Sequence, residues 1–248
     1  MAAVVVGMAV QASVGFGFGF FAAPAALAAY PPAEAVTLLL LLALLINALI
    51  LYSEGREREI DPRACVLLCA WALPGVVAGA LVVRHVDANV LQILIGVGIV
   101  LAALLQARTA DHASPAREEQ RHAAANAGPT LAGGGVCAGV LTSATSLNGP
   151  AVVLTLTRAG LREHLLRDTG AAAFLVLAVL GTAALAAIAH AGHSLPSWPL
   201  LVALVPAVAV GHRIGAALFR RLDADRHRRL VLAAAVVAGT VSIVAGAV

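Results

Sequence analysis

The sequence predicts an all-α polytopic membrane protein with about eight transmembrane helices in two four-helix repeats, the first and fifth helices being broken. Of its 248 residues, 61% are hydrophobic and only 12% are charged, whereas a soluble domain has about 25% charged residues. Mean hydropathy is +0.94. Because roughly 20 apolar residues span a bilayer, the chain divides into eight candidate segments: 1–28, 33–52, 64–84, 88–107, 127–157, 168–190, 197–219 and 228–248.

The first segment begins at Met1, with no basic region before it and no small-residue cleavage site followed by a polar domain. We therefore interpret it as a membrane segment and not as a cleaved signal peptide. An alternative is that 1–30 forms a re-entrant hairpin. The number of crossing helices would then fall to seven, and the N-terminus would move to the other face.

Two stretches of the chain repeat each other. Residues 79–89 (GALVVRHVDAN) and 215–225 (GAALFRRLDAD) share Gly, Ala, Arg, Asp and Ala at an offset of 136, and Pro24 and Pro150 each follow a break in an apolar segment. Internal repeats are common in transporters. Four helices is an even number, so we expect both halves to have the same orientation, related by an axis along the membrane normal. The expected division is an N-terminal repeat, a polar linker and a C-terminal repeat: 1–107, 108–126 and 127–248.

The basic residues, all of them Arg, lie almost entirely between the segments. With eight crossings, ten Arg residues fall beside the loops after the third, fifth and seventh segments, and six fall on the side that holds the termini. The positive-inside rule then predicts that both termini lie outside the cell, in a multi-pass protein of the plasma or inner membrane. The net charge of +3 reflects this topology and gives no reason to expect nucleic acid as a partner.

Two breaks interrupt otherwise apolar segments. The first runs from Gln11 through VGFGFGFFAAP (14–24) and has glycines at alternate positions. The second, TSATSLNGP over 142–150, gathers five hydrogen-bonding side chains. Helix breaks near the midplane are where transporters bind substrate, because half-helix N-termini present free N–H groups to an anion. The predicted substrate-binding residues are Gln11, Ser13, Gly15, Gly17, Gly19, Ser143, Thr145, Ser146, Asn148 and Gly149.

Other interpretations of these polar residues stay open. Small and hydroxyl residues also allow membrane helices to pack closely. Asn47, isolated in the second segment, is expected either to reach the site or to bond a neighbouring helix. No acidic residue lies in the middle of a segment, so a site rich in N–H and O–H donors suits an anion better than a cation. We expect no cofactor and no metal, and we interpret Cys65, Cys69 and Cys137 as small buried residues.

The residues of the two breaks carry a resemblance. With GFGFGFFAAP followed by PPAEAV, and with TSATSLNGPAVVLTL, the sequence resembles the TauE/SafE (TSUP) family of sulfite and organosulfur anion exporters over essentially its whole length. The resemblance implies a secondary transporter that exports a small sulfur-containing anion, such as sulfite, sulfoacetate or another sulfonate. Phe16 and Phe18 separate glycines that are adjacent in many members, and Ser, Ala and Thr replace glycines of the second break, so the identity of the anion stays open.

Three rival functions remain at this point. The first is a passive anion channel, and the second is an intramembrane enzyme with Ser143 or Ser146 as nucleophile and His212 as base. No G-x-S-x-G sequence supports the enzyme. The third is a subunit of a larger membrane complex, which would have no use for paired polar breaks. The expected partners are a small anionic substrate and the lipid bilayer, and a homo-oligomer is left open.

Overall fold

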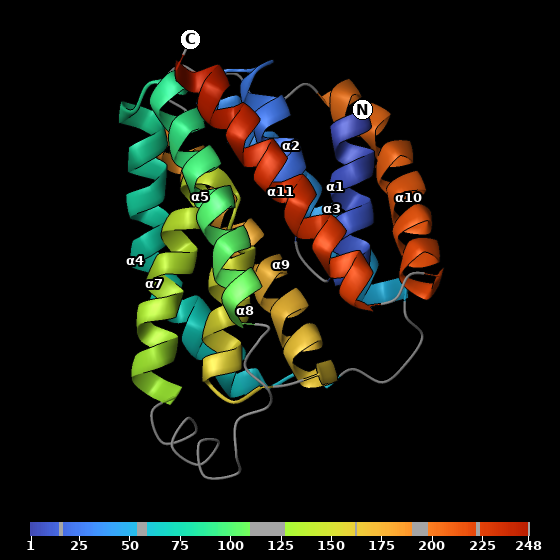
Figure 1. Cartoon of the computed structure of the whole chain (residues 1–248). Helices are drawn as coiled ribbons and strands as arrows, with labels where there is room; N and C mark the ends of the chain where they lie inside the picture. Colours follow the sequence, from blue (N-terminus) through green and yellow to red (C-terminus); the bar gives the residue numbers. More distant parts are fainter. Residues whose placement is uncertain are drawn as a thin grey trace.

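The computed structural model describes residues 1–14, 17–53, 59–109, 127–161, 163–189, 198–221 and 224–247, and every secondary-structure element within them is a helix. Figure 1 shows these helices gathered into one bundle. They are α1 (Ala2–Val14), α2 (Phe18–Leu27), α3 (Pro32–Ser53), α4 (Pro62–His85), α5 (Ala88–Thr109), α7 (Ala127–Thr145), α8 (Gly149–Arg158), α9 (Glu163–Ala189), α10 (Trp198–Arg221) and α11 (Ala224–Ala247).

Several of these helices have the length and composition of membrane spans. Within the described residues, Pro32–Leu51, Pro62–His85 and His164–Ile188 are long and apolar enough to cross a bilayer. Shorter apolar stretches lie in the other helices: Ala2–Ala12, Phe18–Leu27, Ala88–Leu101, Pro199–Gly215 and Ala235–Ala247. The start of α4 has two sequence features that favour a helix amino terminus. Pro62 occupies the first helical position, and the Asp61 carboxylate accepts a hydrogen bond from Ala64 N at 2.9 Å.

The fifth predicted segment does not continue through its break but folds back on itself. A Cβ added to Gly134 in α7 would collide with the Thr155 side chain in α8. At 1.5 Å per residue, a continuous helix would separate these two residues by about 30 Å. Therefore α7 and α8 form a hairpin that starts and ends at the same end of the bundle (Figure 1).

The first segment folds back in the same way. A Cβ added to Gly7 in α1 would lie 2.7 Å from the carbonyl oxygen of Phe18 at the start of α2. A continuous helix would separate those residues by about 16 Å. Figure 1 shows α1 running from the N-terminal end of the bundle toward its middle and α2 returning to that end. This is the re-entrant alternative for 1–30.

The two hairpins overturn the expected orientation of the halves. The helices that run the length of the bundle are α3, α4, α5, α9, α10 and α11, three in each half of the chain (Figure 1). Three is an odd number, so the second half enters the bundle in the opposite sense to the first. The α1–α2 hairpin opens toward the end that holds both termini, and the α7–α8 hairpin opens toward the other end. Our prediction of eight crossings in two halves of equal orientation was wrong in this respect, because hydropathy does not distinguish a bend from a reversal.

Glycines hold each hairpin against a helix from the other half of the chain. On the α4–α7 seam, a Cβ on Gly75 or Gly79 would strike the backbone of α7, and one on Gly139 would strike the backbone of α4. On the α1–α10 seam, Gly211 and Gly215 meet the backbone of α1 in the same way. Small residues at these positions allow the backbones to approach closely, as in other membrane helix pairs.

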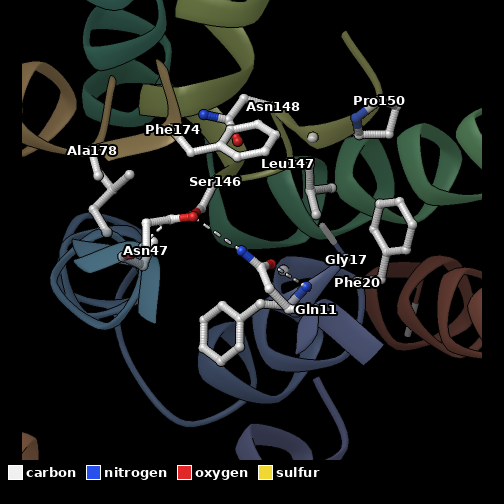
Figure 2. A pocket seen from close by; sticks show the side chains of 15 residues that line it. Gln11, Gly17, Phe20, Asn47, Ser146, Leu147, Asn148, Pro150, Phe174 and Ala178 are labelled. Carbon is white, nitrogen blue, oxygen red and sulfur yellow. Dashed lines mark hydrogen bonds between the residues drawn. The ribbon is translucent and has the colours of Figure 1, made fainter. Parts of the chain in front are cut away.

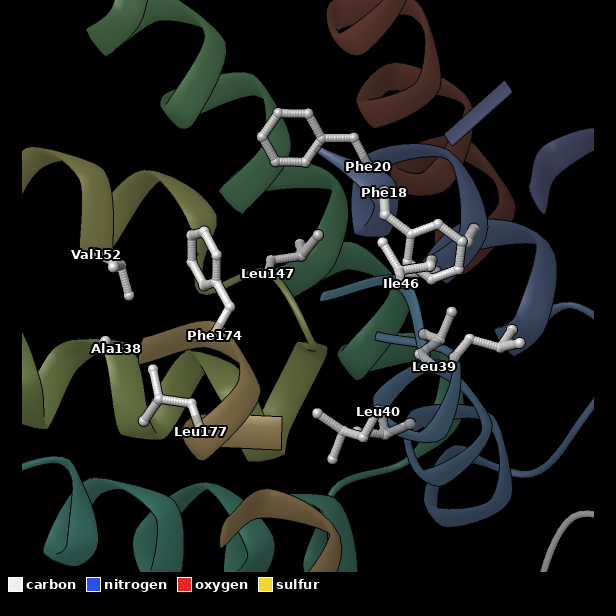
Figure 3. Packing of buried hydrophobic residues seen from close by; sticks show 14 of the residues in the cluster. Phe18, Phe20, Leu39, Leu40, Ile46, Ala138, Leu147, Val152, Phe174 and Leu177 are labelled. Carbon is white, nitrogen blue, oxygen red and sulfur yellow. The ribbon is translucent and has the colours of Figure 1, made fainter. Parts of the chain in front are cut away.

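The remaining long-range contacts complete the bundle. A Cβ on Gly96 of α5 would lie 2.6 Å from the carbonyl oxygen of Gly239 in α11, and the Ser242 hydroxyl donates to the Gln92 carbonyl at 2.8 Å. Buried side chains of α2, α3, α7, α8 and α9 pack around the two breaks (Figure 3). Near the start of α9, the side chains of Asp168 and Thr169 accept hydrogen bonds from the N–H groups of Glu59 and Asp61. These bonds anchor the chain that leads into α4.

Candidate functional site

The two helix breaks meet inside the bundle. A Cβ added to Gly19, at the start of α2, would lie 2.8 Å from the carbonyl oxygen of Ser146 in the second break. Both breaks contain left-handed backbone, with φ of 113° at Gly17 and 58° at Ser146. Left-handed residues reverse the chain where a helix would otherwise continue, so the local sequence of each break supports the hairpin that it forms.

A cavity lies at this meeting point. The volume that the centre of a water molecule can occupy in this cavity is about 30 Å³. A single water needs roughly 10–15 Å³ by the same measure. Figure 2 shows its polar side chains, which come from both breaks and from α3. The lining residues are Gln11, Gly17, Phe18, Gly19, Phe20, Leu40, Ala43, Asn47, Ser146, Leu147, Asn148, Gly149, Pro150, Phe174 and Ala178.

On the side of the first break, Gln11 connects α1, α2 and α3. Its Oε1 atom accepts a hydrogen bond from Phe18 N at 3.1 Å, and its Nε2 atom donates to Asn47 Oδ1 at 3.4 Å. Phe18 N is the first N–H of α2, which has no partner within its own helix. The Gln11 carboxamide, only 6% exposed, therefore occupies the amino terminus of α2 in this structure.

Asn47 links this pair to α3. Its Nδ2 atom donates to the Ala43 carbonyl at 2.7 Å while its Oδ1 atom accepts from Gln11, and the side chain lines the cavity. Both alternatives for Asn47 are therefore found together: it bonds a neighbouring helix and it reaches the site. The carboxamide orientations follow from Phe18 N, because only an oxygen can face an N–H donor.

On the side of the second break, the hydroxyl groups are used to form the turn. Thr142 and Thr145 donate to the carbonyls four residues earlier, at 2.7 and 2.8 Å, and Thr145 Oγ1 also accepts from Leu147 N at 3.2 Å. The Asn148 Nδ2 atom donates to Thr142 Oγ1 at 2.9 Å. Because the side chain of Asn148 bonds backward through Nδ2, its carbonyl oxygen is not used in that bond.

Two helix amino termini reach the cavity. The helices α2 and α8 are each ten residues long, and neither Gly17 nor Asn148, the residue before each helix, caps it with its own side chain. The first backbone bond of α8 runs from Val152 N to the Asn148 carbonyl, so the N–H groups of Gly149 and Ala151 precede the bonded pattern. Helix amino termini carry partial positive charge and bind anions.

The structure places the predicted site residues in three groups. Those that line the cavity are Gln11, Gly17, Gly19, Ser146, Asn148 and Gly149. Ser143 and Thr145 are fully or almost fully buried but do not belong to the lining. A Cβ on Gly79 would lie 3.1 Å from Ser143 Cβ, so Ser143 sits on the seam with α4. Gly15 and the side chain of Ser13 lie outside the described residues.

Sequence reasoning missed the contribution of α9 to the lining. Phe174 and Ala178, one turn apart on α9, face the cavity opposite the first break (Figure 2). Both are ordinary apolar residues in an apolar helix, so no sequence signal could have singled them out. Phe18 and Phe20 belong to the first break, whose interleaved aromatic pattern could have indicated them, and Leu147 belongs to the second break.

The chemistry of the lining is that of a polar but uncharged site. None of the described residues that line the cavity is ionisable, and positions 13–16 are Ser, Val, Gly and Phe. Across the described residues, no three His, Cys, Asp or Glu side chains gather in a group that could hold a metal ion. The three cysteines are unpaired, and Cys137 is exposed where we expected a buried residue.

The residues of the rival enzyme hypothesis are not assembled. The hydroxyl of Ser143 and Nδ1 of His212 are both buried without a hydrogen-bond partner, so they do not bond each other. His212 lies outside the cavity lining, which contains Ser146. A nucleophile needs a base within hydrogen-bond reach. The arrangement can accommodate a small anion through N–H and amide donors, but it offers no activated nucleophile.

Comparison with known proteins gives one family. The family model described as sulfite exporter TauE/SafE matches residues 1–242. Neither the comparison with curated proteins nor the comparison with solved structures gives a match.

Proposed function

Because the chain belongs to the sulfite exporter TauE/SafE family, we propose that it exports a small sulfur-containing anion through the cavity between its two helix breaks. Members of this family are membrane transporters and not enzymes, so the chain is a multi-pass membrane transporter of a small anion. The finer parts of the proposal are the substrate class, which is sulfite, sulfoacetate or another sulfonate, the binding residues, and an alternating-access mechanism.

The proposed membrane arrangement has six crossing helices and two re-entrant hairpins. In it, residues 1–107 and 127–248 are inverted repeats, each consisting of one hairpin followed by three crossing helices. The packing supports this pairing, because α4 lies on α7 as α10 lies on α1, and α3 and α5 meet their counterparts α9 and α11. Irregular backbone in a bilayer is tolerated where protein covers it, and both breaks lie inside the bundle.

The proposed orientation places both termini outside. With the hairpins re-entrant, the order of segments along the chain assigns every Arg except Arg84 to the side of the membrane opposite the termini. The Arg residues are thus divided between the two sides of the membrane far more unevenly than they would be with eight crossings. Since cytoplasmic loops carry the excess of Arg and Lys, that end is the cytoplasmic one, and export runs from it toward the termini.

The observation that carries the proposal is the cavity at the junction of the breaks. The amino termini of α2 and α8 approach it from opposite ends of the bundle, and three carboxamides, those of Gln11, Asn47 and Asn148, line it. This matches the general design of secondary transporters, in which discontinuous helices in repeated halves direct their positive ends at an anionic substrate.

Alternating access is supported by a difference between matched helix pairs. In the inverted repeat, α4 with α9 corresponds to α10 with α3. The first pair packs extensively, whereas the second pair barely touches. If α10 and α3 came together while α4 and α9 separated, the two halves would exchange their arrangements. One side of the cavity would then close and the other would open, as in other inverted-repeat transporters.

The test is anion flux in proteoliposomes that contain the purified chain. We expect saturable flux of sulfite or a sulfonate, reduced at least 10-fold in Asn148→Ala and unchanged in Asn89→Ala, which alters an exposed residue at the start of α5. Wild-type flux in Asn148→Ala across substrate concentrations would refute the assignment of the site. Flux that does not saturate would favour the passive channel, and no anion flux from folded protein would refute the transport proposal.

A further inference from the structure

The cavity has no fixed charge to offset the charge of its substrate. Its polar atoms belong to three carboxamides, one hydroxyl and backbone groups. Its remaining side chains are apolar, with three phenylalanines among them. An anion that enters exchanges most of its hydration for N–H donors and apolar surface, so electrostatics decides which anions the site accepts.

Among the described residues that line the cavity, the built-in positive potential comes from the two broken helices. Each helix amino terminus carries the equivalent of about half an elementary charge. Two such termini, those of α2 and α8, reach one cavity. The Gln11 oxygen already accepts the first N–H of α2, so together they supply at most about one positive charge. This amount matches one negative charge on the substrate and falls short of two.

The free energy of desolvation makes this difference decisive. Moving an ion from water into a medium of low dielectric constant costs much of its hydration free energy. That cost rises with the square of the charge, whereas attraction to the helix termini rises only in proportion to the charge. A doubly charged anion therefore loses about four times the hydration energy and regains about twice the attraction.

We infer that the site accepts its anion in the singly charged form. Monovalent sulfonates such as methanesulfonate satisfy this condition at every pH, and sulfite satisfies it as the hydrogensulfite ion. Sulfate does not, nor does sulfoacetate near neutral pH, because its carboxylate adds a second charge, so the inference narrows the proposed substrate class. The inference rests on the proposed function and adds to it the charge state of the substrate.

The acceptors of the cavity fit the protonated form of such an anion. The hydrogensulfite ion carries one acidic hydrogen and needs one acceptor besides its N–H donors. The Asn148 Nδ2 atom is engaged with Thr142 Oγ1, which leaves the carbonyl oxygen of this lining residue to accept that hydrogen.

The first test compares three anions in proteoliposomes at mildly acidic and mildly alkaline pH. We expect methanesulfonate to be carried at rates independent of pH and sulfate at least 10-fold more slowly. The rate for sulfite should fall in alkaline buffer in proportion to its singly charged fraction. Methanesulfonate also controls for coupling to protons, which would change its rate as well. Sulfate carried as fast as methanesulfonate would overturn the inference and leave the proposed function intact, whereas no flux of any anion would refute both.

The second test changes the charge of the cavity at constant shape. Asn148→Asp adds one negative charge that cancels the helix termini, so methanesulfonate flux should fall at least 10-fold in alkaline buffer. It should recover in acidic buffer as the new carboxyl group is protonated, although the wild-type rate does not depend on pH. Asn89→Asp, which adds the same charge at an exposed position, should change nothing. Full methanesulfonate flux through folded Asn148→Asp in alkaline buffer would overturn the inference.

Discussion

In the first break, Gly17 adopts φ of 113° and Gln11 of the preceding helix supplies the oxygen that caps α2. In the second, Ser146 adopts φ of 58°, and Thr145, immediately before it, accepts the N–H of Leu147. Each break therefore reverses the chain and brings a helix amino terminus to the same cavity. The first does so with a residue that lacks a side chain and a cap from seven residues away, the second with hydroxyl groups inside the turn.

This difference shows that polar residues near a break have separate roles. The hydroxyls of Thr142 and Thr145 bond backbone carbonyls of their own helix and hold the turn, and only Ser146 and Asn148 among the polar side chains of that break line the cavity. In the first break, Gly17 adopts the left-handed conformation without a side chain, and the buried Gln11 faces the cavity. Most of the polar side chains of the second break therefore hold the turn or lie outside the cavity lining.

The largest expected effect concerns the seams that hold the hairpins. Gly139→Val on α7 and Gly215→Val on α10 each place a branched side chain against the backbone of the facing helix. We expect each to destabilise the fold by about 3 kcal/mol or more, measured by thermal unfolding in detergent. Gly133→Val, on α7 where a Cβ meets nothing within 4 Å, should be close to neutral. If Gly215→Val does not lower the stability, α1 does not pack against α10 as closely as α7 packs against α4.

The next effect distinguishes the two carboxamides. Gln11→Ala leaves the buried N–H of Phe18 without its acceptor, which should lower the free energy of unfolding by about 1–3 kcal/mol. Saturating anion should restore part of this loss. Asn148→Ala removes a half-buried group and should weaken anion binding with less effect on stability. Equal stability losses in the two variants, neither of them reduced by anion, would contradict the cap that we assign to Gln11.

A smaller effect tests the two turns. Gly17→Ala places a side chain at positive φ and should destabilise by about 1–2 kcal/mol, and Thr145→Val should lose about 1 kcal/mol with the acceptor of Leu147 N. Both should also slow transport, because they displace the helix termini. Gly160→Ala, at φ of 95° outside the cavity, should lose stability alone. Reduced transport in Gly160→Ala would show that flux follows stability and not the geometry of the breaks.

The smallest effect concerns Ser143. Its buried hydroxyl has no partner in the structure, so Ser143→Ala removes a group that contributes little, and stability should change by less than about 0.5 kcal/mol. Transport should be unchanged. A marked loss of transport in this variant would return Ser143 to the set of substrate ligands that the sequence indicated.

The sequence was sufficient for the class of protein, the two breaks and several cavity residues, because these depend on local composition. An apolar helix is recognised by its content, and a break by Gly, Pro and hydroxyl residues. The direction of the chain after a break is a different matter. It depends on contacts such as the one between Gly134 and Thr155, which join residues far apart in sequence, and neither residue is unusual by itself.

The sequence nevertheless contained one indication of the reversals. Counting Arg with both the first and the fifth segment re-entrant leaves Arg84 alone on its side, whereas eight crossings divide the Arg residues much more evenly. A steep charge asymmetry is typical of a correct topology. The roles of Ser143, Thr145 and Phe174 had no such indication, because the facing of a side chain within a membrane bundle is set by the neighbouring helices.

The placement of the charges also bears on how the chain is made. No charged side chain lies between Met1 and Glu34, and the first basic residue after the α1–α2 hairpin is Arg56, so the positive charges that follow this hairpin lie beyond α3. On the proposed orientation, Arg56, Arg58 and Arg63 retain the carboxyl end of α3 in the cytoplasm and thereby send the first hairpin to the outer face. The α7–α8 hairpin emerges between Arg121 and Arg158. Basic residues synthesised after the first hairpin thus contribute to its orientation, and the second hairpin is held from both ends as it is inserted.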